Sequence, residues 1–153
     1  MALADILQPE GIIPALRAHT KKQLLVELAA TASKLTGISE REIFDVVLQR
    51  ERLGSTGVGG GIAIPHGKLK SLNKIIGVFA RLETPVDFEA LDDQPVDLVF
   101  MLLAPEGAGA DHLKALSRIA RALRDQDLVA RLRSSETVPA IDACLNQEQA
   151  SAA

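Results

Sequence analysis

His66 is the residue whose type and neighbours most clearly indicate chemistry. It lies in the segment Gly-Ile-Ala-Ile-Pro-His-Gly-Lys at residues 61–68, just after a short apolar run and between Pro65 and Gly67. A neutral imidazole is nucleophilic near pH 7, and a phosphoryl group on its ring stays reactive enough to be passed on. Proline restricts the approach of the backbone, and we expect glycine to leave one side of the ring open to a docking protein. The segment therefore predicts a phosphate-accepting histidine.

Nucleotide-binding loops do not fit the same segment. A P-loop has four residues between its glycine and its Gly-Lys pair, and Ser or Thr follows the lysine. Here five residues separate Gly61 from Gly67-Lys68, one of them is proline, and Leu69 follows. The run at 57–62 also lacks the last glycine of G-x-G-x-x-G, and no strand is predicted before it. The segment therefore matches neither a P-loop nor a G-x-G-x-x-G dinucleotide-binding motif.

Cationic side chains close to His66 in the sequence are candidates to balance a phosphate. Phosphate oxygens need N–H donors and positive charge, which Arg50, Arg52, Lys68 and the glycine-rich backbone could provide. Thr56 could add a hydroxyl group.

The other histidines have different surroundings. His112 falls in the first turn of a predicted helix, where unpaired N–H groups and the helix dipole favour an anion. His19 precedes a helix cap without any motif around it and is expected on the surface. A metal-dependent hydrolase built on His19, His66 and His112 is an alternative of another class, but the chain has no H-x-H or H-E-x-x-H spacing. A binding module that takes up no phosphate is a further alternative.

Helices and strands must both position these residues. The N-terminal half of the sequence predicts two helices. A short extended piece is expected at 11–14. Thr20 is a predicted N-cap and Gly37 a predicted end of the first helix, while Ser39 and Glu42 form a capping box for the second. The helix interiors follow from apolar residues at helical spacing, which are Leu24, Leu25, Leu28, Ala32 and Leu35, then Ile43, Val46 and Val47.

Strands are predicted in the middle of the chain and helices in its last third. The glycine-rich stretch 54–61 is expected to be too flexible for regular structure. Strands are predicted at 62–64, 75–82 and 96–104, with a short edge strand at 85–88, and the nearly continuous apolar run of 96–104 indicates a strand covered on both faces. Three helices should follow, with apolar stripes of Leu113, Leu116, Ile119, Ala120 and Leu123, then Leu128, Val129 and Leu132, then Val138, Ile141, Ala143 and Leu145.

The element order predicts an α/β fold with three layers. A central mixed sheet of four to five strands, flanked by helices, is the simplest packing for the order β-α-α-β-β-β-α-α-α. The chain of 153 residues fits a single domain at 1–147, and the polar tail at 148–153 is expected to be disordered.

Composition and charge limit the remaining function classes. The net charge is −3, the chain lacks Trp and Tyr, and it has four Phe, so nucleic-acid binding is not expected. Cys144 is the single cysteine and should pack on a helix face as an inert thiol. No run is long and apolar enough for a signal peptide or a membrane span, so the protein is expected in the cytoplasm, without direct membrane insertion.

The run at 49–69, QRERLGSTGVGGGIAIPHGKL, resembles the signature of the mannitol/fructose-type enzyme IIA family, EIIA type 2, of the bacterial phosphoenolpyruvate-dependent phosphotransferase system. Similar stretches occur at 77–86, 93–98 and 112–117, so the resemblance spans nearly the whole domain. Within the family, the sequence is most similar to the nitrogen-related, stand-alone regulatory branch. The family fold agrees with the element order above.

The resemblance implies roles for particular residues. His66 matches the phosphorylated histidine, which carries the phosphoryl group on its tele nitrogen, Nε2. His112 matches the second active-site histidine, which orients or stabilises that group. Arg50 matches the arginine of the R-E-x-x-x-x-T-G segment that closes over the phosphate. Whether Thr56, Arg52 or Lys68 contacts the phosphate stays open.

The resemblance also implies partners. A phosphorylated HPr-like carrier protein (NPr) is expected to donate the phosphoryl group, and this transfer needs no cofactor. Regulatory targets in this branch include potassium transport proteins and sensor kinases. We expect regulation because no sugar-translocating segment or IIB domain is recognisable in the sequence. The alternative is a sugar-specific fructose- or mannitol-type IIA that passes its phosphate to a IIB component.

Overall fold

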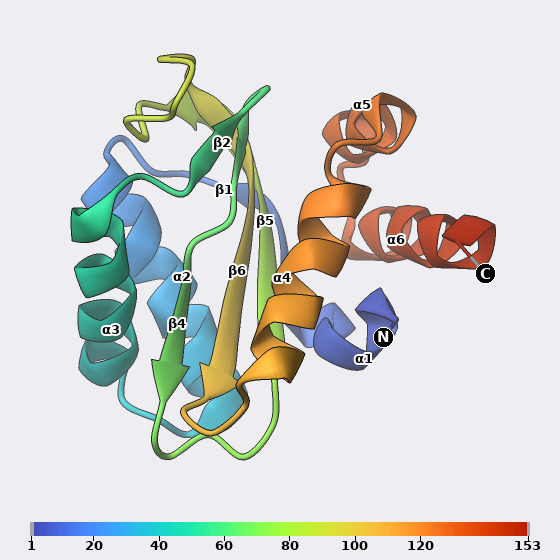
Figure 1. Cartoon of the computed structure of the whole chain (residues 1–153). Coiled ribbons are helices and arrows are strands. Elements are labelled where there is room, and N and C mark those ends of the chain that lie inside the picture. The colour runs from blue at the N-terminus through green and yellow to red at the C-terminus, as the bar shows by residue number, and fades with distance from the viewer. Residues whose placement is uncertain (1, 153) are drawn as a thin grey trace.

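The computed structural model describes residues 2–152, with side chains through Asn146. Helices enclose a sheet in the order α-η-β-α-α-β-β-β-β-β-α-α-α, where η is a 3-10 helix. The elements (Figure 1) are α1 (Leu3–Ile6), η1 (Pro9–Gly11), β1 (Ile12–Leu16), α2 (Lys21–Thr36), α3 (Glu40–Leu53), β2 (Gly57–Gly59), β3 (Ile62–Ala63), β4 (His66–Leu69), β5 (Ile76–Val86), β6 (Val96–Pro105), α4 (Ala110–Ala122), α5 (Gln126–Ser134) and α6 (Val138–Ala152).

The ends of α2 and α3 follow the signals predicted from the sequence. The Thr20 hydroxyl accepts the N–H of Gln23 at the start of α2, and Gly37 ends this helix with φ of 77°. Ser39 accepts the N–H of Glu42 at the start of α3, which is the first half of the predicted capping box. These bonds satisfy amide groups that the first turn of a helix leaves unpaired.

The sheet is mixed, as predicted, with six strands rather than four to five. Its order is β1-β5-β6-β3-β2, and β4 also pairs with β6. Strands β3 and β4 both pair with β6 in parallel. Strand β3 lies opposite Leu98–Val99 and β4 lies opposite Leu102–Pro105, so the two short strands follow one another along β6. The extra strands arise because the histidine segment is divided and because Gly57–Gly59 pairs antiparallel with β3.

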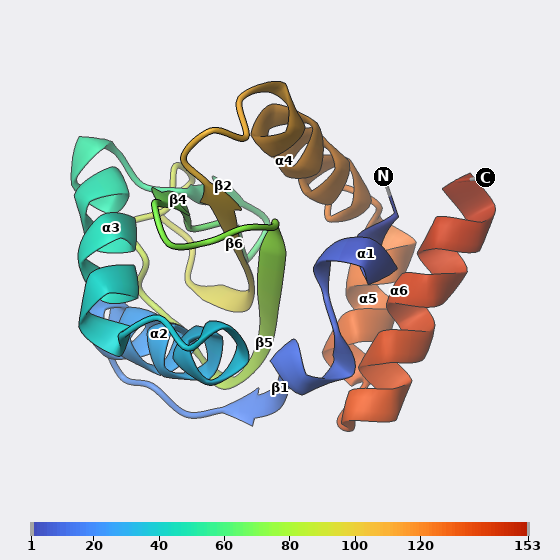
Figure 2. The same cartoon turned by 90° about the horizontal axis from the view of Figure 1, so that it is seen from below.

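Strand β6 is covered on both faces, as its apolar run predicted. Val99, Met101 and Leu103 belong to one core with α2 and α3, while Leu98, Phe100 and Leu102 belong to a second core with α1, α4, α5 and α6. Successive side chains of a strand point to opposite faces, so every residue of this run except the partly exposed Asp97 is buried. Figure 2 shows the resulting three layers, with α2 and α3 on one side of the sheet and the other helices opposite.

Several sequence predictions were wrong in detail. The stretch 54–61 is not wholly irregular, since it contains β2, and residues 85–88 form no separate edge strand, because β5 continues to Val86. In α4 the buried residues are His112, Ala115, Arg118, Ile119 and Ala122. Of the predicted stripe, Ile119 and Leu123 are buried and Leu116 and Ala120 are partly buried, whereas Leu113 is 64% exposed. The apolar pattern did not indicate this buried face because one of its residues, His112, is polar. Ala143 of α6 is exposed, whereas its neighbour Cys144 is buried, as predicted.

The side chains of the expected tail lie outside the described residues. The backbone of α6 continues to Ala152, but side chains beyond Asn146 are not described, so disorder at 148–153 stays a prediction. No helix in the described part of the chain has the length and apolar character that a bilayer crossing requires.

Candidate functional site

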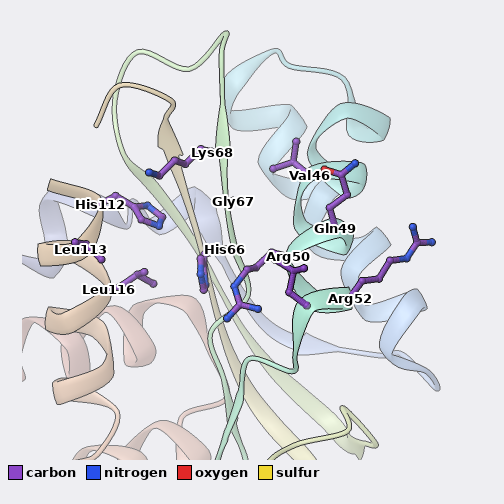
Figure 3. A pocket seen from close by; sticks show the side chains of 11 residues that line it. Val46, Gln49, Arg50, Arg52, His66, Gly67, Lys68, His112, Leu113 and Leu116 are labelled. Atoms are coloured by element: carbon purple, nitrogen blue, oxygen red, sulfur yellow. The ribbon is translucent and has the colours of Figure 1, made fainter. Parts of the chain in front are cut away.

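His66, His112 and Arg50 line one hollow on the surface. The hollow has a volume of about 710 Å³ and lies between α3, β4 and α4. Figure 3 shows His66 between the other two side chains, with His112 approaching from α4 and Arg50 from α3. Three segments far apart in the sequence thus contribute one residue each.

His66 is the first residue of β4 and is half-buried. The sequence placed it in a loop after a strand, and the structure places it at the point where the strand resumes after Pro65. Its Nδ1 lies 2.9 Å from the carbonyl oxygen of Ile64. A carbonyl can only accept, so Nδ1 must carry the proton, which leaves the lone pair of the neutral ring on Nε2. The geometry therefore selects Nε2 as the nucleophilic nitrogen.

His112 lies beside His66 in the first turn of α4, as predicted. The two ring centroids are 5.6 Å apart and the rings are tilted by 54°. His112 is buried, and its Nδ1 has no hydrogen-bond partner among the described residues. Buried polar atoms are usually bonded, so an orphan ring nitrogen next to a nucleophile is a strong indication of a functional position.

Both histidines are held neutral by their surroundings. Burial lowers the pKa of His66 below 6.5, the nearby Arg50 charge lowers it further, and the Ile64 carbonyl and Glu51 oppose these effects. Burial also lowers the pKa of His112, followed by the charges of His66 and Lys68. Charged imidazole has no lone pair to attack with, so a lowered pKa keeps His66 competent as a nucleophile at neutral pH.

The cations predicted near His66 differ in their placement. Arg50 points toward His66, and its Nη1 donates to the carbonyl of Gly54 at 2.8 Å, which fixes the side chain at the end of α3. Lys68 extends from β4 toward α4. Arg52 lines the hollow but points away from His66. Arg50 is therefore the cation best placed to meet an anion on Nε2.

Thr56 does not reach the hollow. It is buried, and both its backbone N–H and its hydroxyl donate to the carboxylate of Glu51. Glu51 is a residue that sequence reasoning missed. A signal was available, because Ile43, Val47 and Glu51 share the buried face of α3 at a spacing of four residues. A carboxylate in an apolar stripe needs a partner inside the protein.

Gly67 serves a purpose other than the predicted one. It is buried, and a Cβ at this position would lie 2.5 Å from Cγ1 of Val46. The absence of a side chain lets α3 approach β4 closely, which brings Arg50 and His66 together. Gly67 also lines the hollow, and its expected role in opening the imidazole to a partner stays a prediction.

The rim of the hollow is basic and partly apolar. Leu53 is 85% exposed and Leu113 is 64% exposed. An adjoining hollow shares Leu113 and is lined by Lys114, Ser117, Arg118 and Arg121. No Asp or Glu lines either hollow within the described part of the chain. This basic rim contrasts with the net charge of −3.

His19 takes no part in the site. It is exposed, as predicted, and belongs to a separate hollow beside Thr20 and Lys22. Among residues 2–146, no group of three or more His, Cys, Asp or Glu side chains is placed to hold a metal ion. The three histidines thus do not form a ligand set.

Comparison with known proteins gives one consistent result. The model of the family described as phosphoenolpyruvate-dependent sugar phosphotransferase system, EIIA 2, matches residues 5–148. The chain is 61% identical over 153 residues to the nitrogen regulatory protein of Bradyrhizobium diazoefficiens, with 100% of both chains covered. The crystal structure of nitrogen regulatory protein IIA-Ntr from Neisseria meningitidis has a TM-score of 0.89 at 34% identity, with coverage of 94% of this chain and 98% of that one. The IIA mannitol structure from Escherichia coli has a TM-score of 0.76 at 26% identity, with 90% and 97% covered.

The fold and the matched family model define a IIA component of a phosphotransferase system. The chain belongs to the EIIA type 2 family, in its nitrogen regulatory group. This result confirms the resemblance drawn from residues 49–69.

Proposed function

We propose that this protein accepts a phosphoryl group on Nε2 of His66 from the phosphohistidine of an HPr-like carrier, and that it regulates partner proteins in the cytoplasm through its phosphorylation state. The observation that carries the proposal is the bond between His66 Nδ1–H and the Ile64 carbonyl, which leaves Nε2 as the nucleophile in an open hollow.

The transfer needs no cofactor. The N–P bond on the carrier breaks as the lone pair of Nε2 forms a new N–P bond in line with it, and the carrier imidazole leaves with its electron pair. The phosphorylated ring of His66 becomes a cation, because Nδ1 keeps its proton. The Ile64 carbonyl, which already accepts that N–H, stabilises the new positive charge. No proton has to move when the carrier's phosphorylated ring carries a proton on its other nitrogen, because that ring then leaves as neutral imidazole.

Arg50 and His112 are proposed to hold the transferred group. Arg50 carries five N–H donors, of which Nη1 donates one to Gly54, so others can meet the phosphate oxygens. The orphan Nδ1 of His112 belongs to a ring 5.6 Å from that of His66. Donors fixed before the reaction stabilise the transferred charge without reorganisation.

The basic rim supports regulation by charge. A phosphoryl group adds about −1.5 to −2 charge near pH 7. At the centre of a rim lined by Arg50, Arg52 and Lys68, this charge offsets much of the positive local field and should thereby change which partners dock. The exposed Leu53 and Leu113 provide apolar contact area for such a partner. The carrier (NPr), potassium transport proteins and sensor kinases are the proposed partners.

Phosphorylation by the purified system tests the proposal. Phosphoenolpyruvate, the first general enzyme and the small carrier should label the wild-type protein with an acid-labile, base-stable phosphate. His66→Ala should abolish labelling, whereas His19→Ala is the matched control and should label fully. His112→Ala should still label, but with altered rate or stability. Full labelling of His66→Ala would refute the assignment.

A sugar-specific IIA is the second candidate. The likeness to the IIA mannitol structure from Escherichia coli favours it. Such a protein would pass its phosphate to a IIB component, so the labelled protein should be incubated with purified mannitol- and fructose-type IIB. Rapid loss of label to IIB would establish this function, and retention of label would support the regulatory one.

A further inference from the structure

A largely buried group of polar residues is hydrogen-bonded to the segment before His66 and does not line the hollow. We call it the Glu51 network, which consists of Lys21, Glu51 and Thr56. The side chain of Glu51 is 2% exposed, and Lys21 Nζ lies 3.0 Å from its Oε1. The Thr56 backbone N–H donates to both carboxylate oxygens at 3.2 Å, and the Thr56 hydroxyl donates to Oε2. The carboxylate is thus paired and fully bonded within the protein.

The network connects three separate elements. Glu51 lies near the C-terminal end of α3, Lys21 is the first residue of α2, and Thr56 precedes β2. Lys21 is itself held in place, because its ammonium group lies 4.5 Å from the centroid of the Phe88 ring. A buried carboxylate with these partners fixes the turn after α3 relative to both helices.

Hydrogen bonds connect the network to the nucleophile. The carbonyl of Thr56 accepts the N–H of Ile64 at 3.0 Å. The carbonyl of Ile64 accepts Nδ1–H of His66 at 2.9 Å. The position of the carbonyl that selects the tautomer of His66 therefore depends on Thr56, and the position of Thr56 depends on Glu51.

We propose that Glu51 and Thr56 are positioning residues for phosphoryl transfer, which act by fixing the Ile64 carbonyl and thereby the Nδ1–H tautomer and the orientation of His66. The inference rests on the proposed function, since it assumes that His66 is the acceptor. It gives the Glu and Thr of the R-E-x-x-x-x-T-G segment a task distinct from that of Arg50. Partners that orient a reactive imidazole typically matter by a factor of about ten or more when they are removed.

Glu51→Gln is the main test, because glutamine keeps the shape and one acceptor but loses the charge and the second acceptor. Glu83→Gln is the matched control, since Glu83 pairs with Arg17 at the surface outside the network. The transfer rate is measured at saturating phosphorylated carrier, together with the carrier KM. The tautomer of His66 is measured separately by long-range proton–nitrogen NMR of the unphosphorylated ring at pH 8.

The expected result for Glu51→Gln is a rate lower by about tenfold or more, with an unchanged carrier KM and a mixture of ring tautomers in place of Nδ1–H alone. The control should match the wild type in all three. A folded Glu51→Gln protein with wild-type rate and tautomer overturns the inference. A slower rate with an unchanged tautomer overturns it too, because the network would then act through something other than the His66 ring.

Two further variants decide the matter if Glu51→Gln does not fold. Thr56→Val removes only the hydroxyl bond, and Thr56→Ser restores it. Thr56→Val should shift the His66 tautomer and slow phosphoryl transfer, whereas Thr56→Ser should do neither. If the two variants have the same tautomer and the same transfer rate, the inference is overturned. The NMR reading needs no phosphate, so a failure of the proposed function, seen as absence of label on wild-type His66, is distinguishable from a failure of the network.

Discussion

Replacement of Gly67 by alanine tests the close contact between α3 and β4 that brings Arg50 to His66. The added Cβ would lie 2.5 Å from Cγ1 of Val46. Carbon atoms pack optimally at about 3.5–4.0 Å, so the helix or the strand must move by roughly 1 Å or more. Valine cannot relieve the clash by rotation, because its χ1 is nearly fixed in a helix.

The expected destabilisation follows from the size of this overlap. Overpacking in a well-packed region costs about 1–3 kcal/mol. For a domain of this size each kcal/mol lowers Tm by about 2–4 °C, so Gly67→Ala should lower Tm by roughly 2–12 °C. Gly107 is the matched control, because a Cβ there meets no atom within 4 Å.

A double-mutant cycle measured by urea denaturation checks the cause. Val46→Ala removes Cγ1 and by itself should cost roughly 1 kcal/mol, since Val46 is only partly buried. In the double variant the clash is absent, so the two effects should differ from additivity by at least about 1 kcal/mol in the favourable direction. Additive effects, or a Gly67→Ala protein as stable as Gly107→Ala, would refute the reasoning.

Three further predictions concern pH, salt and a helix cap. The pKa values of His66 and His112 are lowered in the folded protein, first by burial. The unfolded chain therefore binds protons first, and stability should be full above pH 6.5 and decline as the pH falls from 6.5 toward the lowered values. Urea denaturation at pH 7.5 and pH 5.5 measures how much the free energy of unfolding falls between the two. This fall should be smaller in His66→Ala than in the wild type, and unchanged in His19→Ala. The basic rim predicts that labelling at low carrier concentration slows as salt rises, because the incoming phosphoryl group is anionic, and Arg52→Ala should weaken this salt dependence without changing the saturated rate. Ser39→Ala should cost about 1 kcal/mol in urea denaturation, since it removes the acceptor of the Glu42 N–H; an unchanged midpoint would contradict this.

The sequence predicts well what depends on neighbouring residues. Caps at Thr20 and Ser39 and the glycine end at Gly37 follow from local hydrogen bonding and backbone conformation, and all three occur as predicted. The apolar run of β6 indicates a strand covered on both faces because its pattern lacks polar positions. The helix start before His112 places this residue correctly in the first turn of α4, while the motif around His66 places it next to a strand without predicting that it begins β4.

What the sequence does not predict depends on contacts between distant segments. The reason for Gly67 is Val46, which lies on another element and leaves no trace in the glycine's own neighbourhood. The inward face of α4 includes the polar His112, which is buried beside His66, while Leu113 of the predicted apolar stripe is exposed. Thr56 is a different case: it looked available to a phosphate because sequence reasoning missed that the nearby Glu51 carboxylate is buried and accepts its hydroxyl.

The parallel pairing of β4 with β6 also bears on how the protein is made. Residues 66–69 pair with residues 102–105, and His112 comes later still. During synthesis the nucleophile emerges from the ribosome well before its strand has a partner, and contacts at such sequence separation form late in folding. The nascent chain therefore presents His66 on unpaired backbone, and the ring acquires its neighbour only after α4 has emerged. Fragments that end before Ala110 also lack α4, α5 and α6, which build one of the two cores, so phosphate uptake at this histidine should report on completed chains and be absent from such ribosome-bound fragments.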